Sequence, residues 1–257
     1  MAKEVIVSAN KVRKRKIASR VVKLSLLGLL LFLMVLYIIL AIIYNEGKFT
    51  VTLDSNKTLQ SGIAIYDDIN HAIGQRKLEA ESIRFMDNIS FKWLPDDLDS
   101  DEKYGAHNGD NYIAYTFFVE NQNTQVLNYW YEVVVDDVIK NVDEAIRIRI
   151  YHNGEAKTYA KLSSLDNTPE ENTIPFKQIT DAEESIILEE VKDFQPGQRD
   201  RITVVVWLEG DDPDCIDPLI GGELKMHMVI TENHTEPKEE WKVWEREKQI
   251  ERKRLMH

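Results

Sequence analysis

The sequence predicts a mainly β protein, an antiparallel β-sandwich of the jelly-roll or immunoglobulin-like kind, which follows a single N-terminal transmembrane helix and precedes a short C-terminal helix. Three features support this. Residues 24–43 form an apolar run without a charge, about ten short segments after it are rich in strand-forming residues, and residues 239–257 are densely charged. Long apolar runs indicate membrane helices, and alternation with a period of two indicates half-buried strands.

The N-terminal helix is predicted from the run Leu24–Ile43, LSLLGLLLFLMVLYIILAII. Twenty helical residues span about 30 Å, the thickness of a hydrocarbon core. Seven lysines and arginines lie between Lys11 and Lys23. Because cytoplasmic flanks are rich in positive charge, the sequence predicts a single-pass protein of the cell membrane with a cytoplasmic N-terminus and an extracytoplasmic body. A cleaved signal peptide is the weaker alternative, since the run is long and no small-x-small cleavage site follows it.

The strand candidates share β-branched and aromatic residues, most of them in alternation with polar ones. They are residues 49–53, 82–85, 89–93, 112–119, 127–135, 146–151, 157–160, 186–191, 202–208 and 223–231. His152-Asn-Gly-Glu155 is predicted to be a hairpin turn. Residues 67–80 are expected to hold a helix, and residues 141–145 a single helical turn.

The domain plan follows from these elements. Residues 1–20 form a cytoplasmic basic segment, 21–44 the transmembrane helix, 45–237 the extracytoplasmic sandwich, and 238–257 a charged helical tail. Trp241 and Trp244 in that tail leave two interpretations open, a solvated helix or a helix that docks onto the body, the membrane or a partner.

Charge is distributed unevenly along the 257 residues. The formal net charge is −12, but residues 1–44 carry eight Lys and Arg against one Glu, a net +7, which leaves −19 for residues 45–257. So acidic a body repels nucleic-acid backbones, and no nucleic-acid partner is expected. The partners expected instead are the lipid bilayer, through residues 21–44, and an envelope or matrix protein, with self-assembly as a further option.

The candidate site is an acidic loop, GDDPDCIDP, between two strand candidates. Asp211, Asp212, Asp214 and Asp217 lie within seven residues. Crowded carboxylates repel one another unless a cation or backbone N–H groups neutralise them, and hard oxygen ligands suit Ca²⁺. A turn fixed by Asp hydrogen bonds is the favoured interpretation, and a Ca²⁺ site, the one cofactor considered, is the alternative. Cys215, the only cysteine, is expected to be an inert packing residue, because nearby aspartates disfavour its thiolate.

A second acidic cluster and the histidines provide no enzyme signature. Asp97, Asp99 and Asp101 have the spacing of a calcium loop, but Glu102 stands where the loop needs glycine and Asn108 where it needs glutamate. A solvated loop is therefore expected there. The six histidines are scattered, and the common hydrolase, zinc-protease and nucleotide-binding motifs are absent from the sequence.

A resemblance to a known family lies in the C-terminal half. Phe194-Gln-Pro-Gly197, Ile202–Cys215 with its W-x-E-G-x-D-x-D-C pattern, and Gly221–Met226 resemble the C-terminal part of the camelysin and TasA-like exported proteins of Gram-positive bacteria, most closely their uncharacterised membrane-anchored relatives. The close match covers about 35 residues. The resemblance implies a jelly-roll-like sandwich at the cell surface with a matrix or fibre role. Camelysin-type proteins are also classed as metallopeptidases, but this chain has no recognisable zinc-protease motif to carry that activity over.

Two functions are therefore expected. The first is a non-enzymatic, membrane-anchored surface protein with a binding or assembly role. The alternative is a metal-dependent surface hydrolase, which requires two or three of His107, His152, His227 and the acidic loops to meet in one pocket.

Overall fold

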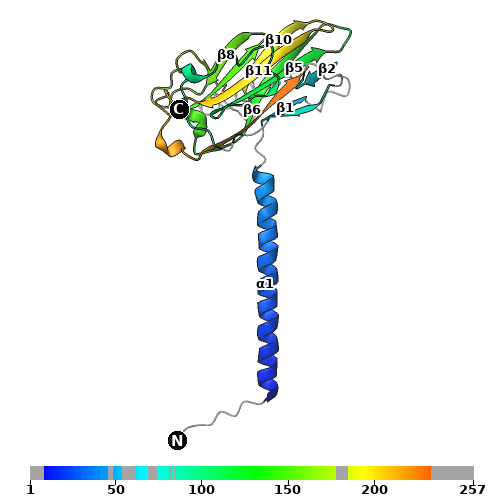
Figure 1. Ribbon diagram of the computed structural model, residues 1–257, viewed down its shortest axis with the longest axis vertical. Coiled ribbons are helices and arrows are strands. Elements are labelled where there is room, and N and C mark those ends of the chain that lie inside the picture. The colour runs from blue at the N-terminus through cyan, green and yellow to red at the C-terminus, as the bar shows by residue number, and fades with distance from the viewer. Residues whose placement is uncertain are drawn as a thin grey trace, which may run out of the picture. The chain divides into compact units, whose positions relative to one another are not determined.

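The computed structural model describes residues 9–45, 49–53, 62–68, 74–80, 83, 85–177 and 185–232. The chain divides into two compact units, Met1–Glu46 and Gly47–His257. We call the described part of the second unit the body (Figure 1). The predicted tail helix at 238–257 lies outside the described residues.

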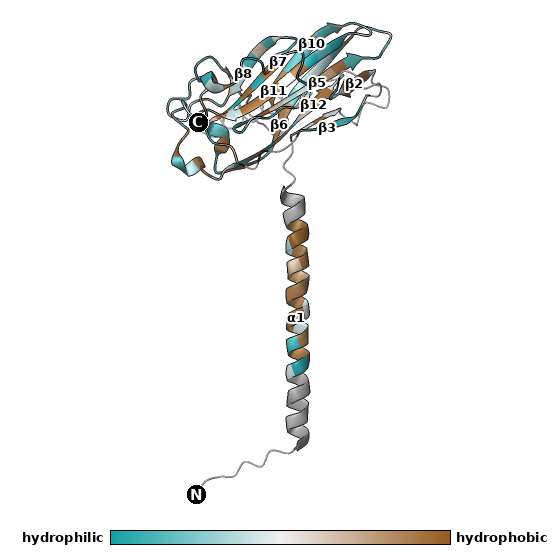
Figure 2. Cartoon of the chain, in the orientation of Figure 1, coloured by the Kyte–Doolittle hydropathy of each residue, from teal (hydrophilic) through white to brown (hydrophobic). Residues whose placement is uncertain are grey.

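The first unit contains one helix, α1 (Ala9–Asn45). Its stretch Ser19–Leu40 has a mean hydropathy of 2.6 and none of it is buried, so by length and composition it can cross a membrane. Figure 2 shows this stretch as mostly brown, the colour of hydrophobic residues. A signal sequence near an N-terminus has the same properties.

The body is built from two β-sheets, which confirms the predicted fold class. In the first sheet, the order is β10 (Ser185–Phe194), β6 (Leu127–Ile139), β12 (Glu223–Thr231), β1 (Thr50–Leu53) and β3 (Lys77–Glu79). In the second sheet, it is β2 (Ile63–Tyr66), β5 (Tyr112–Asn121), β11 (Arg199–Leu208), β7 (Ile146–His152), β8 (Glu155–Ala160) and β9 (Ile174–Pro175), and β4 (Gly105–Ala106) also pairs with β5.

The pairing is mostly antiparallel, with two exceptions among the named strands. β1 runs parallel to β12, and β8 runs parallel to β9. The sheets are therefore mixed rather than purely antiparallel. The parallel pair β1–β12 places the first and last described strands of the body side by side.

The main core lies between the inner faces of the two sheets. Alternate residues of each long strand point inward, as the period of a strand requires. The fully buried contributors include Phe117, Val119, Ile148, Ile150 and Val204 from the second sheet and Tyr129, Val133, Met228 and Ile230 from the first.

A smaller core covers the outer face of the second sheet. Trp207 and Val205 point outward from β11 and are buried by Ile89, Leu94 and Leu98 of the segment that precedes β5. This segment contains the 3₁₀ helix η2 (Phe91–Trp93), so the strand predicted at 89–93 is wrong. Ile89 makes only an isolated bridge to Glu209 before the chain turns.

Other predictions near the N-terminus of the body also need correction. The helix predicted over 67–80 is wrong in its second half, where Leu78 is buried between exposed Lys77 and Glu79 in the strand β3; residues 69–73 lie outside the description. Among residues 82–85, the described ones, 83 and 85, are not in a strand, and β2 was not predicted at all.

Two short features are confirmed. The hairpin turn between β7 and β8 has positive φ at Asn153 (51°) and Gly154 (89°), as a type I′ turn requires. The single helical turn is the 3₁₀ helix η3 (Val142–Glu144).

The body has two ends. At one end β11 finishes at Leu208, which pairs with Ile146 at the start of β7. At the same end β12 begins at Glu223, which pairs with Ile139, the last residue of β6. We call this the acidic-loop end, because the loop of residues 209–222 joins β11 to β12 there. The turns at 122–126 and 153–154 lie at the opposite end.

Candidate functional site

The acidic loop is shaped by its prolines and glycines. Pro218 lies in the first turn of a 3₁₀ helix, η4 (Asp217–Leu219), where a missing N–H is tolerated. Gly221 has φ +72°, and a Cβ on Gly222 would lie 2.8 Å from the Cβ of Val142. The positive φ favours glycine at position 221, and the close approach leaves no room for a side chain at position 222. The two glycines therefore let the loop return directly into β12.

Glu209 fixes the first turn of the loop. Its carboxylate accepts hydrogen bonds from the indole Nε1 of Trp207 at 2.9 Å, the backbone N of Phe91 at 3.1 Å and the backbone N of Asp211 at 3.2 Å. Glu209 is 8% exposed. Hydrogen bonds to a carboxylate are stronger than those between neutral groups, so Glu209 joins the loop firmly to the segment that covers the second sheet.

Asp212 and Asp214 hold the middle of the loop. Asp212 Oδ1 accepts the backbone N of Asp214 at 2.8 Å. The Asp214 carboxylate reaches a different loop, where it accepts the backbone N of Ser164 at 2.8 Å and the Ser164 hydroxyl at 2.5 Å. Both aspartates are buried. The loop after β11 is therefore fastened to the loop after β8.

Arg147 supplies positive charge to this cluster from β7. Its Nη2 lies 2.6 Å from Asp212 Oδ2 and 3.4 Å from Glu170 Oε2. The side chains of Arg147 and Asp212 are 6% and 0% exposed. Asp212 Oδ2 accepts no hydrogen bond, so its contact with Arg147 is an ion pair by distance and charge. One guanidinium thus lies close to two carboxylates at a largely buried position.

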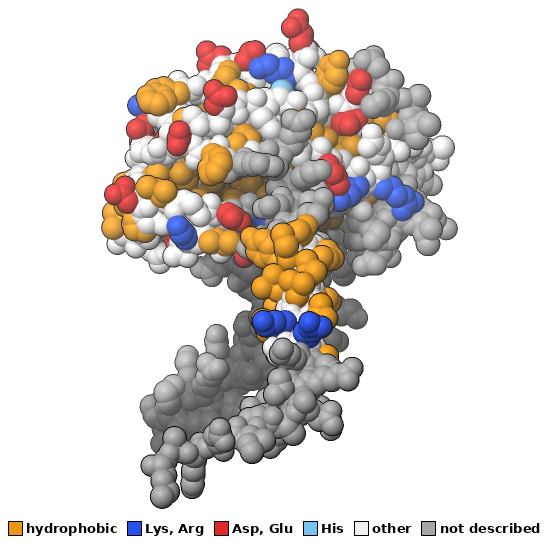
Figure 3. Space-filling model, turned by 60° about the horizontal axis from the view of Figure 1, so that its bottom comes forward, with side chains coloured by type: hydrophobic (Ala, Val, Ile, Leu, Met, Phe, Trp, Pro, Cys, Tyr) orange, Lys and Arg blue, Asp and Glu red, His pale blue; other side chains and the backbone are white. Residues whose placement is uncertain are grey.

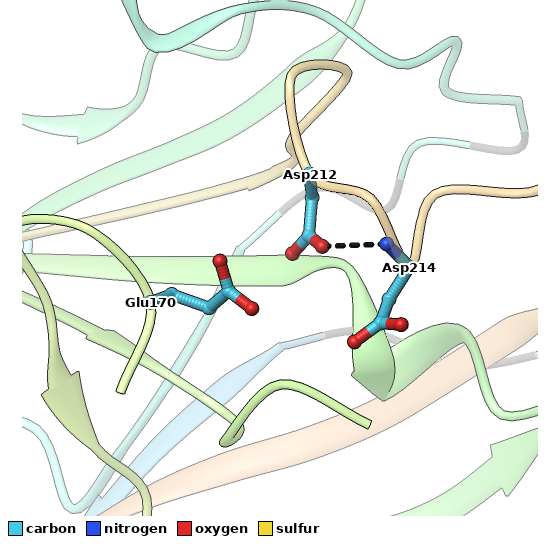
Figure 4. Close-up of side chains that lie close together, drawn as sticks. All are labelled: Glu170, Asp212 and Asp214. Atoms are coloured by element: carbon cyan, nitrogen blue, oxygen red, sulfur yellow. Dashed lines mark hydrogen bonds between the residues drawn. The ribbon is translucent and has the colours of Figure 1, made fainter. Parts of the chain in front are cut away.

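Three carboxylates of this cluster come close enough to share a cation. One oxygen from each of Glu170, Asp212 and Asp214 lies within 4.8 Å of the others. Figure 4 shows Asp212 and Asp214 on one loop and Glu170 approaching from another. The oxygens suit Ca²⁺ in kind, but Arg147 already provides a cation at 2.6 Å. A dication would have to displace this guanidinium, so the cluster fits an arginine better than a metal.

Of the four aspartates that the sequence singles out, the structure brings Asp212 and Asp214 together and leaves the other two outside the cluster. Asp211 accepts the hydroxyl of Ser90 at 2.7 Å and lies 3.9 Å from Lys92 Nζ. Asp217 is exposed in η4. The favoured interpretation of the loop, as a turn fixed by Asp hydrogen bonds, agrees with this geometry.

Burial and like charge shift two groups of the site. The pKa of Glu170 is raised by burial and by repulsion from Asp212 and Asp214, against the attraction of Arg147. The pKa of the Cys215 thiol is raised by burial and by the nearby carboxylates of Asp212 and Glu209. The second shift agrees with the prediction that Cys215 is not an activated thiol.

Sequence reasoning missed Arg147, Glu170 and Ser164. Arg147 alternates with isoleucines in β7, which marks it as a residue of the outer sheet face. Such residues are usually solvated, and Arg147 is buried only because two loops fold over it. The single available signal was an excess of aspartates that needed a positive partner.

The second acidic cluster is solvated at Asp97 and Asp101, as the sequence predicts, but not at Asp99. Asp99 is mostly buried, and its Oδ1 lies 2.9 Å from Arg201 Nη1 and accepts the Thr203 hydroxyl at 2.7 Å. Asp97 forms an ion pair with Lys103 at 2.9 Å. The contacts of Asp99 fasten the segment that precedes β5 to β11, whereas the Asp97–Lys103 pair lies within that segment.

The described histidines do not meet in one pocket. His107 contacts Thr116 at 3.2 Å, and His227 contacts Asp136 at 3.0 Å. His152 Nε2 lies 3.1 Å from the buried Asp200. Within the described residues, no histidine belongs to a group of three or more potential metal ligands. The convergence required of a metal-dependent hydrolase is therefore not found in this part of the chain.

A groove of about 230 Å³ lies on the body away from the acidic cluster. It is lined by residues of β6, β7, β8 and β10, among them Tyr131, His152 and Glu189. Its charged groups are largely paired with one another, as in the ion pairs of Lys157 with Glu189 and of Lys192 with Glu190. Both lysines that line the groove are thus paired with glutamates of the same groove.

Comparison with known proteins adds little. No protein-family model and no curated protein sequence matches the chain. A solved structure with partial similarity is that of a beta-glucosidase from Kluyveromyces marxianus in complex with glucose. The sequences are 10% identical, the match covers 68% of this chain and 16% of that one, and the TM-score is 0.23.

Proposed function

We propose that the protein is a non-enzymatic cell-surface protein with a binding or assembly role, anchored by α1 with its N-terminus in the cytoplasm and its body outside. The observation that carries this proposal is the apolar stretch Ser19–Leu40 joined to a separate β-sandwich. The basic residues before the stretch give the orientation. The resemblance of residues 194–226 to camelysin and TasA-like proteins supports a role in the cell envelope or matrix.

The side-chain chemistry of the body supports binding rather than catalysis. Charged groups that lie close together, such as Arg147 with Asp212 and Arg201 with Asp99, hold loops onto the sheets. Reactive sites instead present a nucleophile or base toward a pocket. The only thiol has a raised pKa. These ion pairs thus have a structural role, as expected of a scaffold that holds a binding surface.

Anchoring is tested by protease treatment of intact, wall-stripped cells. The expected result is loss of residues 45–257 with survival of an N-terminal fragment that includes α1. Cells permeabilised before treatment are the control, because there the cytoplasmic segment should be lost as well. A body that is protected in intact cells, or found free in the medium with a new N-terminus after the apolar stretch, contradicts the proposal.

The binding role is tested by cross-linking the full-length protein in intact cells. A discrete adduct, either with a second copy or with another envelope protein, is expected. Cells that produce the protein without residues 49–257 provide the matched control, in which the adduct should be absent. If no adduct forms at any cross-linker length, the body has no stable partner and the assembly role is refuted.

A further inference from the structure

We propose that His107 makes the attachment of one loop to the outer face of the second sheet sensitive to acid. The loop comprises residues 94–107, which we call the covering loop, and it packs over β5 and β11. At neutral pH an uncharged His107 holds the loop closed, and protonation of the imidazole in mild acid lets the loop open more often. The inference concerns the body alone and does not depend on the proposed anchoring.

A continuous chain of hydrogen bonds joins the covering loop to both strands. The hydroxyl of Thr203 donates to Asp99 Oδ1 at 2.7 Å and lies 2.8 Å from the hydroxyl of Thr116. The hydroxyl of Thr116 lies in turn 3.2 Å from His107 Nε2. Both threonines are fully buried. The two ends of the chain, Asp99 and His107, both belong to the covering loop, so the loop is attached to the sheet at two points.

Only one arrangement of protons satisfies every member of this chain. Asp99 forms an ion pair with Arg201 at 2.9 Å, so its carboxylate accepts hydrogen bonds and donates none. A hydroxyl has a single proton to donate. Thr203 therefore donates to Asp99, and Thr116 donates to Thr203. The oxygen of Thr116 is then left to accept, so His107 carries its proton on Nε2.

The second ring nitrogen keeps His107 uncharged. Its Nδ1 is buried and has no hydrogen-bond partner. In the neutral ring this atom is an acceptor, but in the imidazolium it is a donor, and a buried donor without an acceptor is costly. Burial lowers the pKa of His107 below its ordinary value of 6.5. The positive charges of Lys103 and Arg201 lower this pKa further, and the negative charge of Asp97 offsets only part of the shift.

The lowered pKa couples the covering loop to pH. In the open form the imidazole is solvated and titrates near its ordinary value, so the open form binds a proton more readily than the closed form. The closed form is fully favoured above pH 6.5, and this preference is lost as the pH falls toward the lowered pKa. One proton raises the opening constant by at most about tenfold for each pH unit in that window.

The covering loop can open while the sandwich stays folded. Its buried leucines, Leu94 and Leu98, belong to the smaller core, which is separate from the main core between the sheets. Arg201 opposes opening, because its guanidinium also donates to the carbonyl of Asp99 at 2.6 Å. Acid therefore raises the population of an open form without detaching the loop permanently. The open form uncovers Val205 and with it an apolar part of the second sheet.

The proton position is tested by nitrogen NMR of the full-length protein in detergent micelles, with isotope-labelled and assigned histidines. At pH 7 we expect His107 to be neutral with its proton on Nε2, and to titrate with a midpoint below 6.5. A proton on Nδ1, or an imidazolium at pH 7, overturns the inference. This measurement needs no variant, so it stands even if a substitution at this position prevents folding.

Loop opening is measured by hydrogen exchange and mass spectrometry, with rates corrected for the intrinsic pH dependence of amide exchange. Between pH 7.5 and pH 5 the protection of the covering loop should fall, by at most about tenfold for each pH unit below 6.5, while β7 keeps its protection. Figure 3 shows red acidic side chains scattered over one face of the molecule. Exposed carboxyl groups ordinarily titrate near about pH 4, so a change in this window indicates an imidazole.

Two variants assign the effect to one histidine. In His107→Gln the side-chain amide can donate to Thr116 but does not titrate, so the covering loop should keep its protection down to pH 5. His227→Gln is the matched control, because His227 also contacts a carboxylate, that of Asp136, but lies on β12 in the other sheet. This variant should show the same fall as the wild type. An equal fall in His107→Gln, or no fall in the wild type, overturns the inference.

Discussion

The guanidinium of Arg147 lies 2.6 Å from the carboxylate of Asp212, and both side chains are almost fully withdrawn from water. The pair joins β7 to the loop that follows β11, 65 residues later in the chain. The loop contains three more aspartates. The positive charge of Arg147 therefore offsets part of the negative charge at the acidic-loop end.

Replacing Arg147 by Ala should destabilise the body strongly. The change leaves the buried Asp212 and the partly buried Glu170 without their positive partner, and breaking a buried ion pair from one side costs about 3–5 kcal/mol. Chemical denaturation of the full-length protein in detergent measures the loss. Lys157→Ala is the control, because its pair with Glu189 is solvated and is worth less than about 1 kcal/mol. Equal effects of the two changes would show that the Arg147 pair is not buried in solution.

Replacing Glu170 by Gln should stabilise the body at neutral pH. The raised pKa of Glu170 means that the fold disfavours its charged form, mainly through burial and the nearby Asp212. This penalty is present above the raised pKa and vanishes as the pH falls below the ordinary value, where the group is protonated in both states. Melting temperatures of both proteins should therefore differ at pH 7 and converge near pH 4. A variant that is less stable at pH 7 would mean that the contact with Arg147 outweighs the repulsion.

Calcium should leave the stability of the protein unchanged. Arg147 takes the position that a dication would need among Glu170, Asp212 and Asp214. A cation bound at 100 times its Kd would add about 2.7 kcal/mol to the free energy of unfolding, which a melting curve resolves easily. The measurement compares melting temperatures in millimolar Ca²⁺ and in chelator. A rise with Ca²⁺ that Asp212→Asn together with Asp214→Asn abolishes would establish the calcium site instead.

Acid should weaken the opposite end of the body through Asp200. Burial opposes the charge of this carboxylate, but hydrogen bonds from His152, Asn153, Gln198 and Tyr129 outweigh it and lower its pKa to about 2. A lowered pKa stabilises the fold above the ordinary value of 3.8 and loses that contribution as the pH falls toward 2.

The melting temperature of the wild type should therefore fall more steeply between pH 4 and pH 2 than that of Asp200→Asn, which is expected to be less stable than the wild type at pH 6. Parallel profiles of the two proteins would mean that another carboxylate controls acid unfolding.

The sequence predicts the strands well where β-branched and aromatic residues extend over many positions, as in β5, β7 and β11. It fails where contacts distant in the chain decide the outcome. Phe91 is apolar and lies in an alternating segment, but its N–H bonds to Glu209 and Ser90 caps a 3₁₀ turn, so no strand forms. Likewise, the pattern of β7 identifies Arg147 as outward-facing but cannot show that the loops of residues 161–173 and 209–222 cover it.

The parallel pairing of β1 with β12 also orders events during synthesis. About 170 residues separate the two strands, and a ribosome that adds roughly 5–20 residues per second needs about 9–34 seconds to make them. Until β12 is made, β1 lacks its parallel partner, and β6, once it has been synthesised, lacks at least one of its two neighbours. Their unpaired backbone groups are then open to pairing with other chains. A nascent chain that stalls before residue 223 therefore exposes unpaired strand edges that can aggregate, and β12 is the strand that covers them.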